Sequence, residues 1–237
     1  MGKIGIVIPA YNEERVIQDV LASLPQKIVV AGKTYPCVFI VVNDGSSDHT
    51  AVRASKNQAV HLIDHILNSG AGAATRTGMH YALQLGCQFV VTVDADGQHH
   101  PDDVKRVAEE TVASGLDLII GSRLQQHEGM PWYRVMGNWG LSTITFLLFG
   151  VTVSDSQSGL KGMNRRALEK ITYHSDRYAF CSEMLWRASQ EKLTIREVPI
   201  QAIYTDYSLG KGQGNWGAGF ALVGQLLKRR VMDFING

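Results

Sequence analysis

The sequence predicts an α/β domain in which a mainly parallel sheet is covered by helices on both faces. Apolar runs alternate with helix-like stretches along the first half of the chain. These runs are continuously apolar, which is typical of strands that are buried on both faces. No repeat, low-complexity segment or linker interrupts this order, so we expect one domain over residues 1–237.

Five strands and three helices are expected in the first half. A helix-like stretch follows the turn after Pro9 and ends at Leu24, and Pro101 suits the first turn of a later helix. Asp44 follows the second strand and Asp94 follows the fourth. The strands are predicted at residues 3–8, 36–43, 60–66, 87–93 and 116–121, and the other helices at residues 71–86 and 101–114.

The second half of the chain predicts amphipathic helices. Residues 135–153 carry no charge and are nearly long enough to span a membrane, but they include three glycines and several hydroxyls. We therefore expect an interfacial or core helix there. A last helix is predicted at residues 217–235, and its basic residues 228–230 suit either anionic lipid headgroups or the helix C-terminus. Its apolar residues recur at a spacing of three to four: Phe220, Val223, Leu227, Val231 and Phe234.

Composition narrows the functional classes. The chain has 23 Lys and Arg against 22 Asp and Glu, and its formal charge of +1 gives no overall attraction for nucleic acid. A hydrophobic content of 45% argues against disorder. Cys37, Cys87 and Cys181 form no CxxC pair, and the first residues show no targeting pattern. These features are typical of reduced thiols in a cytoplasmic protein.

Three polar clusters follow predicted strands, at residues 9–14, 43–48 and 94–98. In an open parallel sheet, ligands bind beyond the carboxyl ends of the strands, so we expect the clusters to converge. Asp94, Asp96 and Gln98 are two residues apart, so their side chains point the same way in an extended segment. Their oxygens suit Mg²⁺ or Mn²⁺, which would also relieve the repulsion between the carboxylates. The alternative is a turn with Asx hydrogen bonds.

Other polar residues near these clusters are less specific. His99 and His100 lack a third ligand at zinc spacing, so we expect solvated loop histidines. Asp44 suits a nucleoside, while Ser47 or Asp48 caps the next helix. Residues 68–72 form a Gly-rich turn that is compatible with close approach to phosphate. It is neither a P-loop nor a dinucleotide fingerprint, which makes a dehydrogenase improbable.

Seven motifs in order resemble the family 2 glycosyltransferases of the GT-A fold. Within that family the chain is most similar to the polyprenyl-phosphate sugar transferases related to dolichol-phosphate mannose synthase. The resemblance runs from residue 4 to about residue 214 and implies a Rossmann-like GT-A domain. The motifs are IVIPAYNEE, VVNDGSSDHT, NSGAGAATRTG, VDADGQHHPDD, GSR, DSQSGLKGMNRRAL and SEMLWRA.

The resemblance assigns roles to matching positions. It implies a nucleotide-sugar half at residues 1–121, an acceptor half at 122–216 and a C-terminal helix at 217–237. Asp94, Asp96 and Arg123 are the implied catalytic residues, and Asp94, Asp96 and Gln98 the implied metal ligands. The implied donor-binding residues are Pro9, Ala10, Tyr11, Glu13, Asp44, Asp94, Ala95 and Asp96. The implied acceptor-phosphate residues are Ser122, Arg123, Arg134, Ser158 and Lys211.

Several of these positions have an alternative interpretation. Arg123 suits phosphate because its guanidinium forms paired hydrogen bonds, but a surface ion pair is also compatible. Lys211 either closes over phosphate or is a solvated loop lysine. Glu183 orients an arginine or the sugar, or forms an ordinary salt bridge. The chain departs from many relatives at Ala71, where they have Lys, at Asn43, and in lacking C-terminal transmembrane helices.

The resulting hypothesis is inverting transfer of a hexose from GDP-mannose or a UDP-sugar to a polyprenyl phosphate, with Mg²⁺ or Mn²⁺. A phosphate monoester has a second pKa near ~6, so the nucleophile is mostly anionic at neutral pH and needs no strong base. We expect peripheral contact with the cytoplasmic membrane face, a possible membrane-protein partner and no nucleic acid. The rivals are a transferase with a soluble or protein acceptor and a non-catalytic nucleotide-sugar binding module.

Overall fold

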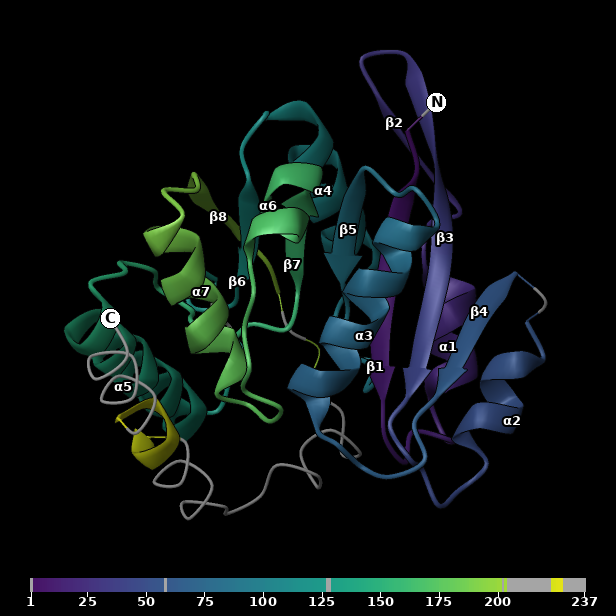
Figure 1. Ribbon diagram of the computed structural model, residues 1–237, viewed down its shortest axis with the longest axis horizontal. Coiled ribbons are helices and arrows are strands. Elements are labelled where there is room, and N and C mark those ends of the chain that lie inside the picture. Colours follow the sequence, from purple (N-terminus) through teal and green to yellow (C-terminus); the bar gives the residue numbers. More distant parts are fainter. Residues whose placement is uncertain (1, 58, 127–128, 202, 204–222, 228–237) are drawn as a thin grey trace.

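A computed structural model describes residues 2–57, 59–126, 129–201, 203 and 223–227 (Figure 1). Its centre is an eight-stranded sheet in the order β2-β3-β1-β5-β7-β6-β8, with β4 also paired to β3. The strands are β1 (Ile4–Ala10), β2 (Lys27–Val30), β3 (Lys33–Asn43), β4 (Val60–Asp64), β5 (Phe89–Thr92), β6 (Leu118–Ser122), β7 (Lys161–Asn164) and β8 (Ile195–Pro199).

The sheet is mainly parallel, as the sequence predicts. Strands β1, β3, β4 and β5 run the same way, and β6 is parallel to β8. Two strands run against their neighbours: β7 is antiparallel to β5 and β6, and β2 forms a hairpin with β3. The chain builds one side of the sheet through β1, β3 and β4, then returns to place β5 on the other side of β1. In open α/β sheets ligands bind where the strand order changes direction in this way, which here is at the carboxyl ends of β1 and β5.

Helices cover both faces of the sheet. One core packs Val7 and Ile40 against α3, α6 and α7, and the other packs Ile6 and Phe39 against α1, α2 and α4. Neighbouring residues of one strand thus enter opposite cores, which explains the continuously apolar runs. The helices are α1 (Ile17–Ser23), α2 (Thr50–Ser55), α3 (Ala71–Gln84), α4 (Pro101–Ala113), α5 (Trp132–Phe149), α6 (Arg165–Lys170) and α7 (Phe180–Gln190).

The five predicted strands are confirmed as β1, β3, β4, β5 and β6, and the three helices as α1, α3 and α4. The helix expected at residues 135–153 is α5, which ends before Gly150 in a left-handed C-cap. In the part of the chain that is described, no helix combines the length and apolarity needed to cross a membrane. Of the predicted last helix, residues 223–227 are helical and the rest lies outside the described residues.

Candidate active site

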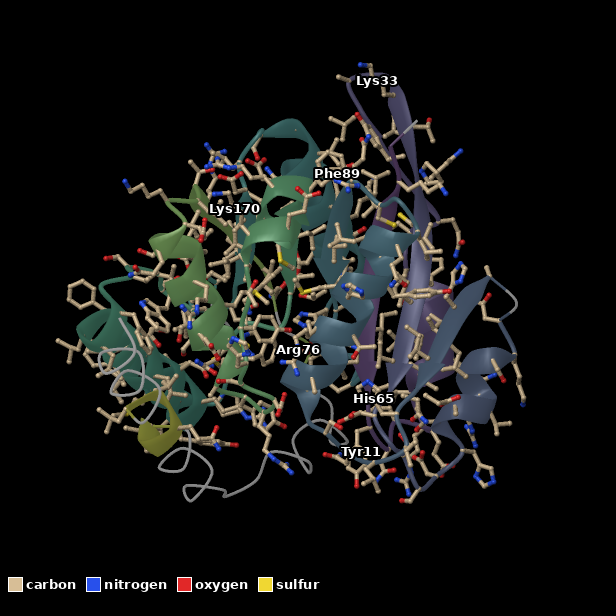
Figure 2. All side chains as sticks on the ribbon, in the orientation of Figure 1. Tyr11, Lys33, His65, Arg76, Phe89 and Lys170 are labelled. Atoms are coloured by element: carbon tan, nitrogen blue, oxygen red, sulfur yellow. The ribbon has the colours of Figure 1, made fainter. Side chains whose placement is uncertain are left out.

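The polar clusters that follow β1 and β3 are joined by hydrogen bonds. The backbone N–H of Asp44 donates to the carbonyl of Ala10 at 2.8 Å. Asn12 links the two loops twice, because its N–H donates to Ser46 Oγ at 3.0 Å and its Oδ1 accepts from the Ser47 N–H at 2.9 Å. In Figure 2, Tyr11 and His65 lie at the opposite end of the molecule from Lys33 and Lys170. The expected convergence at the carboxyl edge is therefore observed for these two loops.

The third cluster, after β5, carries two carboxylates with opposite pKa shifts. Burial disfavours ionisation of Asp94, but a hydrogen bond from His99 Nε2 to its Oδ2 at 3.1 Å and the charges of Arg123 and Lys161 hold its pKa below the usual range. Burial and the charge of Asp94 raise the pKa of Asp96 to about 6. The two carboxylates therefore repel each other across a short distance, as the sequence predicts.

Asp96 is also held by its own turn. The backbone N–H of Gln98 donates to Asp96 Oδ1 at 3.0 Å, which is the Asx hydrogen bond of the alternative interpretation. Glu13 lies near enough to raise the pKa of Asp96 further, so the loop after β1 reaches this cluster too. The described residues contain no group of three or more His, Cys, Asp and Glu side chains arranged to hold a metal ion.

His99 corrects one expectation. Its side chain is buried at 3% exposure and bonded to Asp94, so the prediction of a solvated loop histidine is wrong for His99. Among the described residues its Nδ1 atom has no hydrogen-bond partner. His100 is exposed as expected and accepts a bond from the Asp102 N–H at the start of α4. The sequence could not separate the two because only the fold turns His99 inward.

Asp44 is buried and its carboxylate already has three donors. Oδ1 accepts from His65 Nδ1 at 2.8 Å and from the Ser69 N–H at 3.0 Å, and Oδ2 accepts from the Gly70 N–H at 2.7 Å. His65 Nε2 in turn contacts Thr77 Oγ1 at 3.0 Å. Asp44 therefore fixes the turn that leads into α3, and its contact with a donor stays a prediction. Asp48 Oδ1 accepts from the Thr50 N–H just before α2, but the N-cap of α2 is His49, so the prediction of a cap at Ser47 or Asp48 is wrong in position.

The Gly-rich turn before α3 packs closely against another loop of the same chain, residues 173–177. A Cβ on Gly70 would clash with the carbonyl of Asp176, and one on Gly72 with the carbonyl of Ser175. Gly70 also has φ +101°, which disfavours other residues. The loop at residues 173–177 therefore fills the space beside this turn, where the sequence predicted the close approach of a phosphate. Arg76 is paired with Asp176 at 2.7 Å.

Glu183 holds that loop in place. It lies in α7 with no exposed surface, and its carboxylate accepts from the His174 N–H at 3.1 Å and from the Ser175 N–H at 2.8 Å. The Ser175 hydroxyl donates to it at 2.6 Å, and Arg187 Nε lies 3.9 Å away. The observed role of Glu183 is thus to shape a loop, and its pairing with Arg187 agrees with the expected contact to an arginine.

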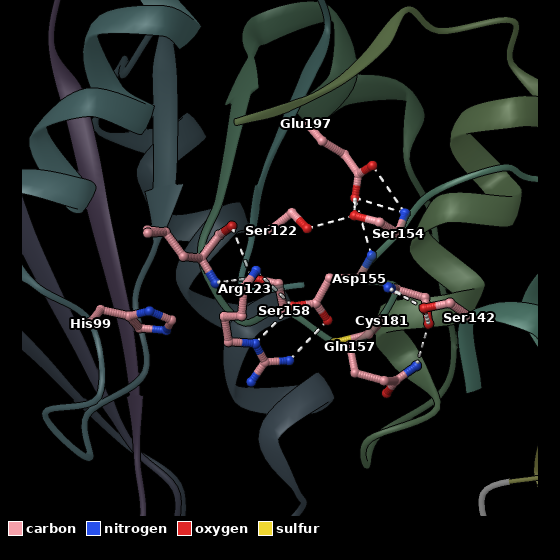
Figure 3. A network of polar contacts seen from close by, with 12 residues as sticks. His99, Ser122, Arg123, Ser142, Ser154, Asp155, Gln157, Ser158, Cys181 and Glu197 are labelled. Carbon is pink, nitrogen blue, oxygen red and sulfur yellow. Dashed lines mark hydrogen bonds and ion pairs between the residues drawn. The ribbon is translucent and has the colours of Figure 1, made fainter. Parts of the chain in front are cut away.

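Arg123 follows β6 and is clamped by Asp155. Its Nε donates to Asp155 Oδ2 at 2.7 Å and its Nη2 to Oδ1 at 2.9 Å (Figure 3). Burial opposes ionisation of Asp155, but the charge of Arg123 and these hydrogen bonds hold its pKa below the usual range. Arg123 is therefore in an ion pair, as the alternative interpretation expects, but the pair is largely buried, with Asp155 at 0% and Arg123 at 15% exposure, and does not lie on the surface. A contact between Arg123 and phosphate stays a prediction.

The hydroxyls that were expected at the acceptor phosphate face inward. Ser122 and Ser158 are fully buried. Ser122 Oγ contacts Ser154 Oγ at 2.6 Å, and Ser158 Oγ accepts from the Leu160 N–H at 3.3 Å. Neither reaches solvent in this structure, so a direct contact with phosphate stays a prediction. Arg134 lies in the first turn of α5 and is partly exposed, and Lys211 lies outside the described residues.

The remaining donor residues line the edge beside Asp94. Tyr11 is exposed, whereas Ala10 and Ala95 are buried and Glu13 is nearly so. Pro9 is partly buried within β1. Exposure at Tyr11 leaves its ring available to a flat ligand such as a base.

Sequence analysis missed two charged residues of this region. Asp155 was read only as part of a motif, and Lys161 was not considered, although it lies at the start of β7 with 1% exposure. The signal in the sequence was limited to their place in the motif DSQSGLKGMNRRAL. Only the fold shows that both charges are buried, which is costly unless opposite charge lies near.

The model of the family "Glycosyl transferase family 2" matches residues 5–172, which is more than half of the chain. The chain belongs to this family. It is thus a glycosyltransferase, and its sheet has the GT-A arrangement. A UDP-N-acetylglucosamine–dolichyl-phosphate N-acetylglucosaminyltransferase of Methanococcus voltae is 39% identical over 95% of each chain. A polyprenol monophosphomannose synthase of Mycolicibacterium smegmatis is 32% identical over 86% of this chain and 78% of that one.

The solved structures support the same fold for this glycosyltransferase. Glucosyl-3-phosphoglycerate synthase of Mycobacterium tuberculosis, in complex with Mn²⁺, UDP and glucosyl-3-phosphoglycerate, aligns with a TM-score of 0.70 at 20% identity. The alignment covers 97% of this chain and 80% of that one. The same enzyme with Mg²⁺ and UDP gives a TM-score of 0.69. At this identity the likeness establishes the fold and leaves the substrates of this chain open.

Proposed function

We propose that this glycosyltransferase moves one hexose from a nucleoside diphosphate sugar to a polyprenyl phosphate, with inversion at the anomeric carbon. The observation that carries the proposal is the pair Asp94 and Asp96 at the sheet edge, with the Arg123–Asp155 pair nearby, in a chain whose relatives act on dolichyl and polyprenyl phosphates. GDP-mannose and UDP-sugars both remain candidate donors. Residues 1–121 would bind the donor, and residues 122–216 the acceptor.

The donor would bind along the loops after β1, β3 and β5. Tyr11 is exposed at this edge and offers an aromatic face to the base. Glu13 would offer an oxygen to the ribose, and Pro9, Ala10 and Ala95 would form the adjoining wall. Because Asp44 already holds the turn before α3, its role toward the donor would be to fix the floor of the site.

The carboxylates fit a divalent cation. Burial, together with repulsion from Asp94, raises the pKa of Asp96 to about 6, and a cation between the two carboxylates would remove the repulsion. With the Gln98 amide they offer three hard oxygen donors, and the remaining positions would be left to the diphosphate. When bound, Mg²⁺ or Mn²⁺ would neutralise charge on the leaving nucleoside diphosphate. His99 would hold Asp94 oriented through its 3.1 Å hydrogen bond.

The acceptor phosphate would approach from the side of Arg123. Asp155 orients the guanidinium with two hydrogen bonds, and a guanidinium that is held in a fixed plane suits the paired oxygens of a phosphate. Arg134 and Lys211 would add positive charge. A phosphate oxygen then attacks the anomeric carbon as the bond to the diphosphate breaks, and no protein base takes a proton because the acceptor is already anionic. Positioning supplies most of the rate.

The exposed face of α5 would contact the lipid. Trp132, Met136, Trp139 and Leu147 are 63–73% exposed, and Phe146 is 49% exposed. They recur at helical spacing along one face of a helix whose single charged residue is Arg134. Trp on an apolar helix face is typical of proteins that lie in the membrane interface. We therefore place the enzyme at the cytoplasmic face of a membrane, with a membrane-protein partner as the other occupant of this face.

The test is a product assay. Purified protein would be incubated with Mg²⁺ or Mn²⁺, a panel of GDP- and UDP-sugars, and a polyprenyl phosphate in vesicles. We expect one glycolipid in the lipid fraction by mass spectrometry, and none when EDTA is added. Sugar transfer to a soluble acceptor instead, or donor binding without transfer, would favour the two rival functions. Flotation with vesicles separates the lipid acceptor from a soluble one.

A further inference from the structure

Lys161 lies at the carboxyl edge of the parallel strands, where the candidate site is, although it belongs to the second half of the chain. It is the first residue of β7, and the antiparallel register places it opposite Thr92 of β5. Two hydrogen bonds join this pair, because the Lys161 N–H donates to Thr92 Oγ1 at 3.3 Å and Thr92 Oγ1 donates to the Lys161 carbonyl at 3.5 Å. Thr92 lies two residues before Asp94, so β7 brings a lysine beneath the carboxylate cluster.

The ammonium of Lys161 is buried without a carboxylate in contact. Its Nζ donates to the carbonyl of Ser158, lies 3.6 Å from Cys181 Sγ and sits 5.9 Å from the centroid of the Phe180 ring. Within the described ranges, no Asp or Glu oxygen is in ion-pair contact with it. A buried ammonium is costly unless opposite charge lies nearby, so its compensation has to come from a longer distance.

The Lys161 charge acts on two carboxylates, Asp94 and Asp155, and both oxygens of Asp155 are also bonded to Arg123. The Asp94 carboxylate lies directly against the Cα atom of Gly159, where a Cβ would clash with it. One short turn, residues 158–161, therefore supports Asp94 on one side and accepts a hydrogen bond from the Lys161 ammonium on the other.

We propose that Lys161 is a positioning residue that sets the charge of the metal and diphosphate site from inside the protein, through the backbone of Gly159 and without touching the substrate. It adds positive potential beneath the carboxylates and beneath the proposed position of the donor diphosphate. It also limits how tightly the carboxylates hold a cation when no nucleotide is bound. The site is thereby tuned to take cation and nucleotide together. This inference rests on the proposed function, since it assumes that the carboxylates face a nucleotide.

The test removes the charge and measures cation and anion binding separately. Lys161→Met keeps the length of the side chain, and Lys161→Gln also keeps a donor for the Ser158 carbonyl, so at least one variant that preserves this turn is available. Mn²⁺ alone is titrated by electron paramagnetic resonance, and UDP and GDP are titrated by calorimetry in EDTA at low salt. Lys170→Met is the control, because Lys170 pairs with Glu191 on an exposed surface far from the site (Figure 2).

We expect opposite shifts. Loss of one buried positive charge should tighten Mn²⁺ binding about threefold and weaken nucleotide binding about fivefold, and the control should change neither. A purely structural role would weaken both ligands together, and that result, like unchanged affinities, would overturn the inference. If the unaltered enzyme bound neither UDP nor GDP even with Mn²⁺, the proposed function itself would fail. The two failures are thus distinguishable.

Discussion

Asp44 and the pair Asp94–Asp96 follow β3 and β5, the two strands that flank β1, but their surroundings differ. Asp44 is 2% exposed and its two oxygens accept three hydrogen bonds from one neighbouring loop. Asp94 has a side chain that is 45% exposed and, among the described residues, accepts one hydrogen bond, from His99, while burial and the charge of Asp94 raise the pKa of Asp96. The carboxylate of Asp44 is satisfied by the protein, whereas the charges of Asp94 and Asp96 are the reason that we propose a cation there. The comparison separates a residue that shapes the site from residues that act in it under the proposed function.

The largest expected effect comes from Asp96. Asp96→Asn removes a proposed cation ligand, so the metal-dependent transfer rate should fall about a thousandfold or more, in the range of losing a main electrostatic contact. The variant should stay folded, because the repulsion from Asp94 disappears with the charge. Transfer rate and thermal unfolding would be measured together. Asp102→Asn is the control, an exposed aspartate at the start of α4. A near-normal rate in Asp96→Asn would show that the cation assignment is wrong.

Asp155 should affect both stability and rate. Asp155→Asn leaves the Arg123 guanidinium without its charged partner, so we expect a loss of about 3 kcal/mol in the free energy of unfolding. Transfer should slow by about a hundredfold because the guanidinium is no longer oriented. Chemical denaturation and the transfer assay measure the two effects. A variant as stable and as active as the unaltered enzyme would contradict the clamp that is shown in Figure 3.

The same pair predicts a pH dependence. The pKa of Asp155 is lower in the folded protein than its ordinary value, so its ionised form stabilises the fold. That stabilisation is present above the unfolded pKa of about 3.9 and is lost as pH falls through the folded pKa. The difference in unfolding free energy between the unaltered protein and Asp155→Asn should therefore be constant near pH 7 and shrink below about pH 4. A difference that grew on acidification would have the wrong sign for a buried carboxylate–guanidinium pair.

Asp44→Asn tests the other side of the comparison between Asp44 and the pair Asp94–Asp96. The amide keeps the shape but turns one acceptor into a donor that faces the Ser69 and Gly70 N–H groups, so unfolding free energy should fall by about 2 kcal/mol. The donor KM should rise several-fold while kcat changes little, since the residue shapes the floor of the site. Steady-state kinetics separates the two constants. A collapse of kcat with unchanged KM would place Asp44 in the chemistry instead.

The smallest expected effect lies on α5. Trp139→Ser removes one exposed ring from the apolar face and should weaken flotation with anionic vesicles about threefold to tenfold. Transfer to a short-chain, water-soluble acceptor phosphate should be unchanged. Val52→Ser, another exposed apolar residue but on α2, is the matched control. Equal flotation of the Trp139 variant and the control would remove α5 from the membrane contact.

Sequence patterns predicted the parallel half of the fold well because strands with two buried faces are continuously apolar. They missed β7 and β8, which do not show that pattern. Strand β7 has four residues and begins with Lys161, and β8 includes the charged residues Arg196 and Glu197. They missed β2 because only its hairpin pairing with β3 makes it a strand. Antiparallel insertion of β7 between β5 and β6 is a property of the whole sheet and has no local signal.

For the candidate site, the sequence predicted the edge of the sheet at which the polar clusters lie and the residue types that they contain. Spacing along β5 was sufficient to find Asp94 and Asp96. It could not reveal that His99 turns inward, that Gly70 and Gly72 admit the loop at residues 173–177, or that Ser122 and Ser158 are buried. Each of these depends on a segment distant in the sequence. Burial of Lys161 is the clearest example, because the opposite charges that it interacts with, Asp94 in the loop after β5 and Asp155, lie on other segments of the chain.

The most direct test of the contrast between these carboxylates is Mn²⁺ binding, followed by electron paramagnetic resonance in three proteins: the unaltered enzyme, Asp96→Asn and Asp44→Asn. We predict that the unaltered enzyme binds one Mn²⁺ more tightly when UDP or GDP is present, that Asp96→Asn loses this site, and that Asp44→Asn keeps it. Equal Mn²⁺ binding by the unaltered enzyme and Asp96→Asn, or loss of the site only in Asp44→Asn, would contradict the account.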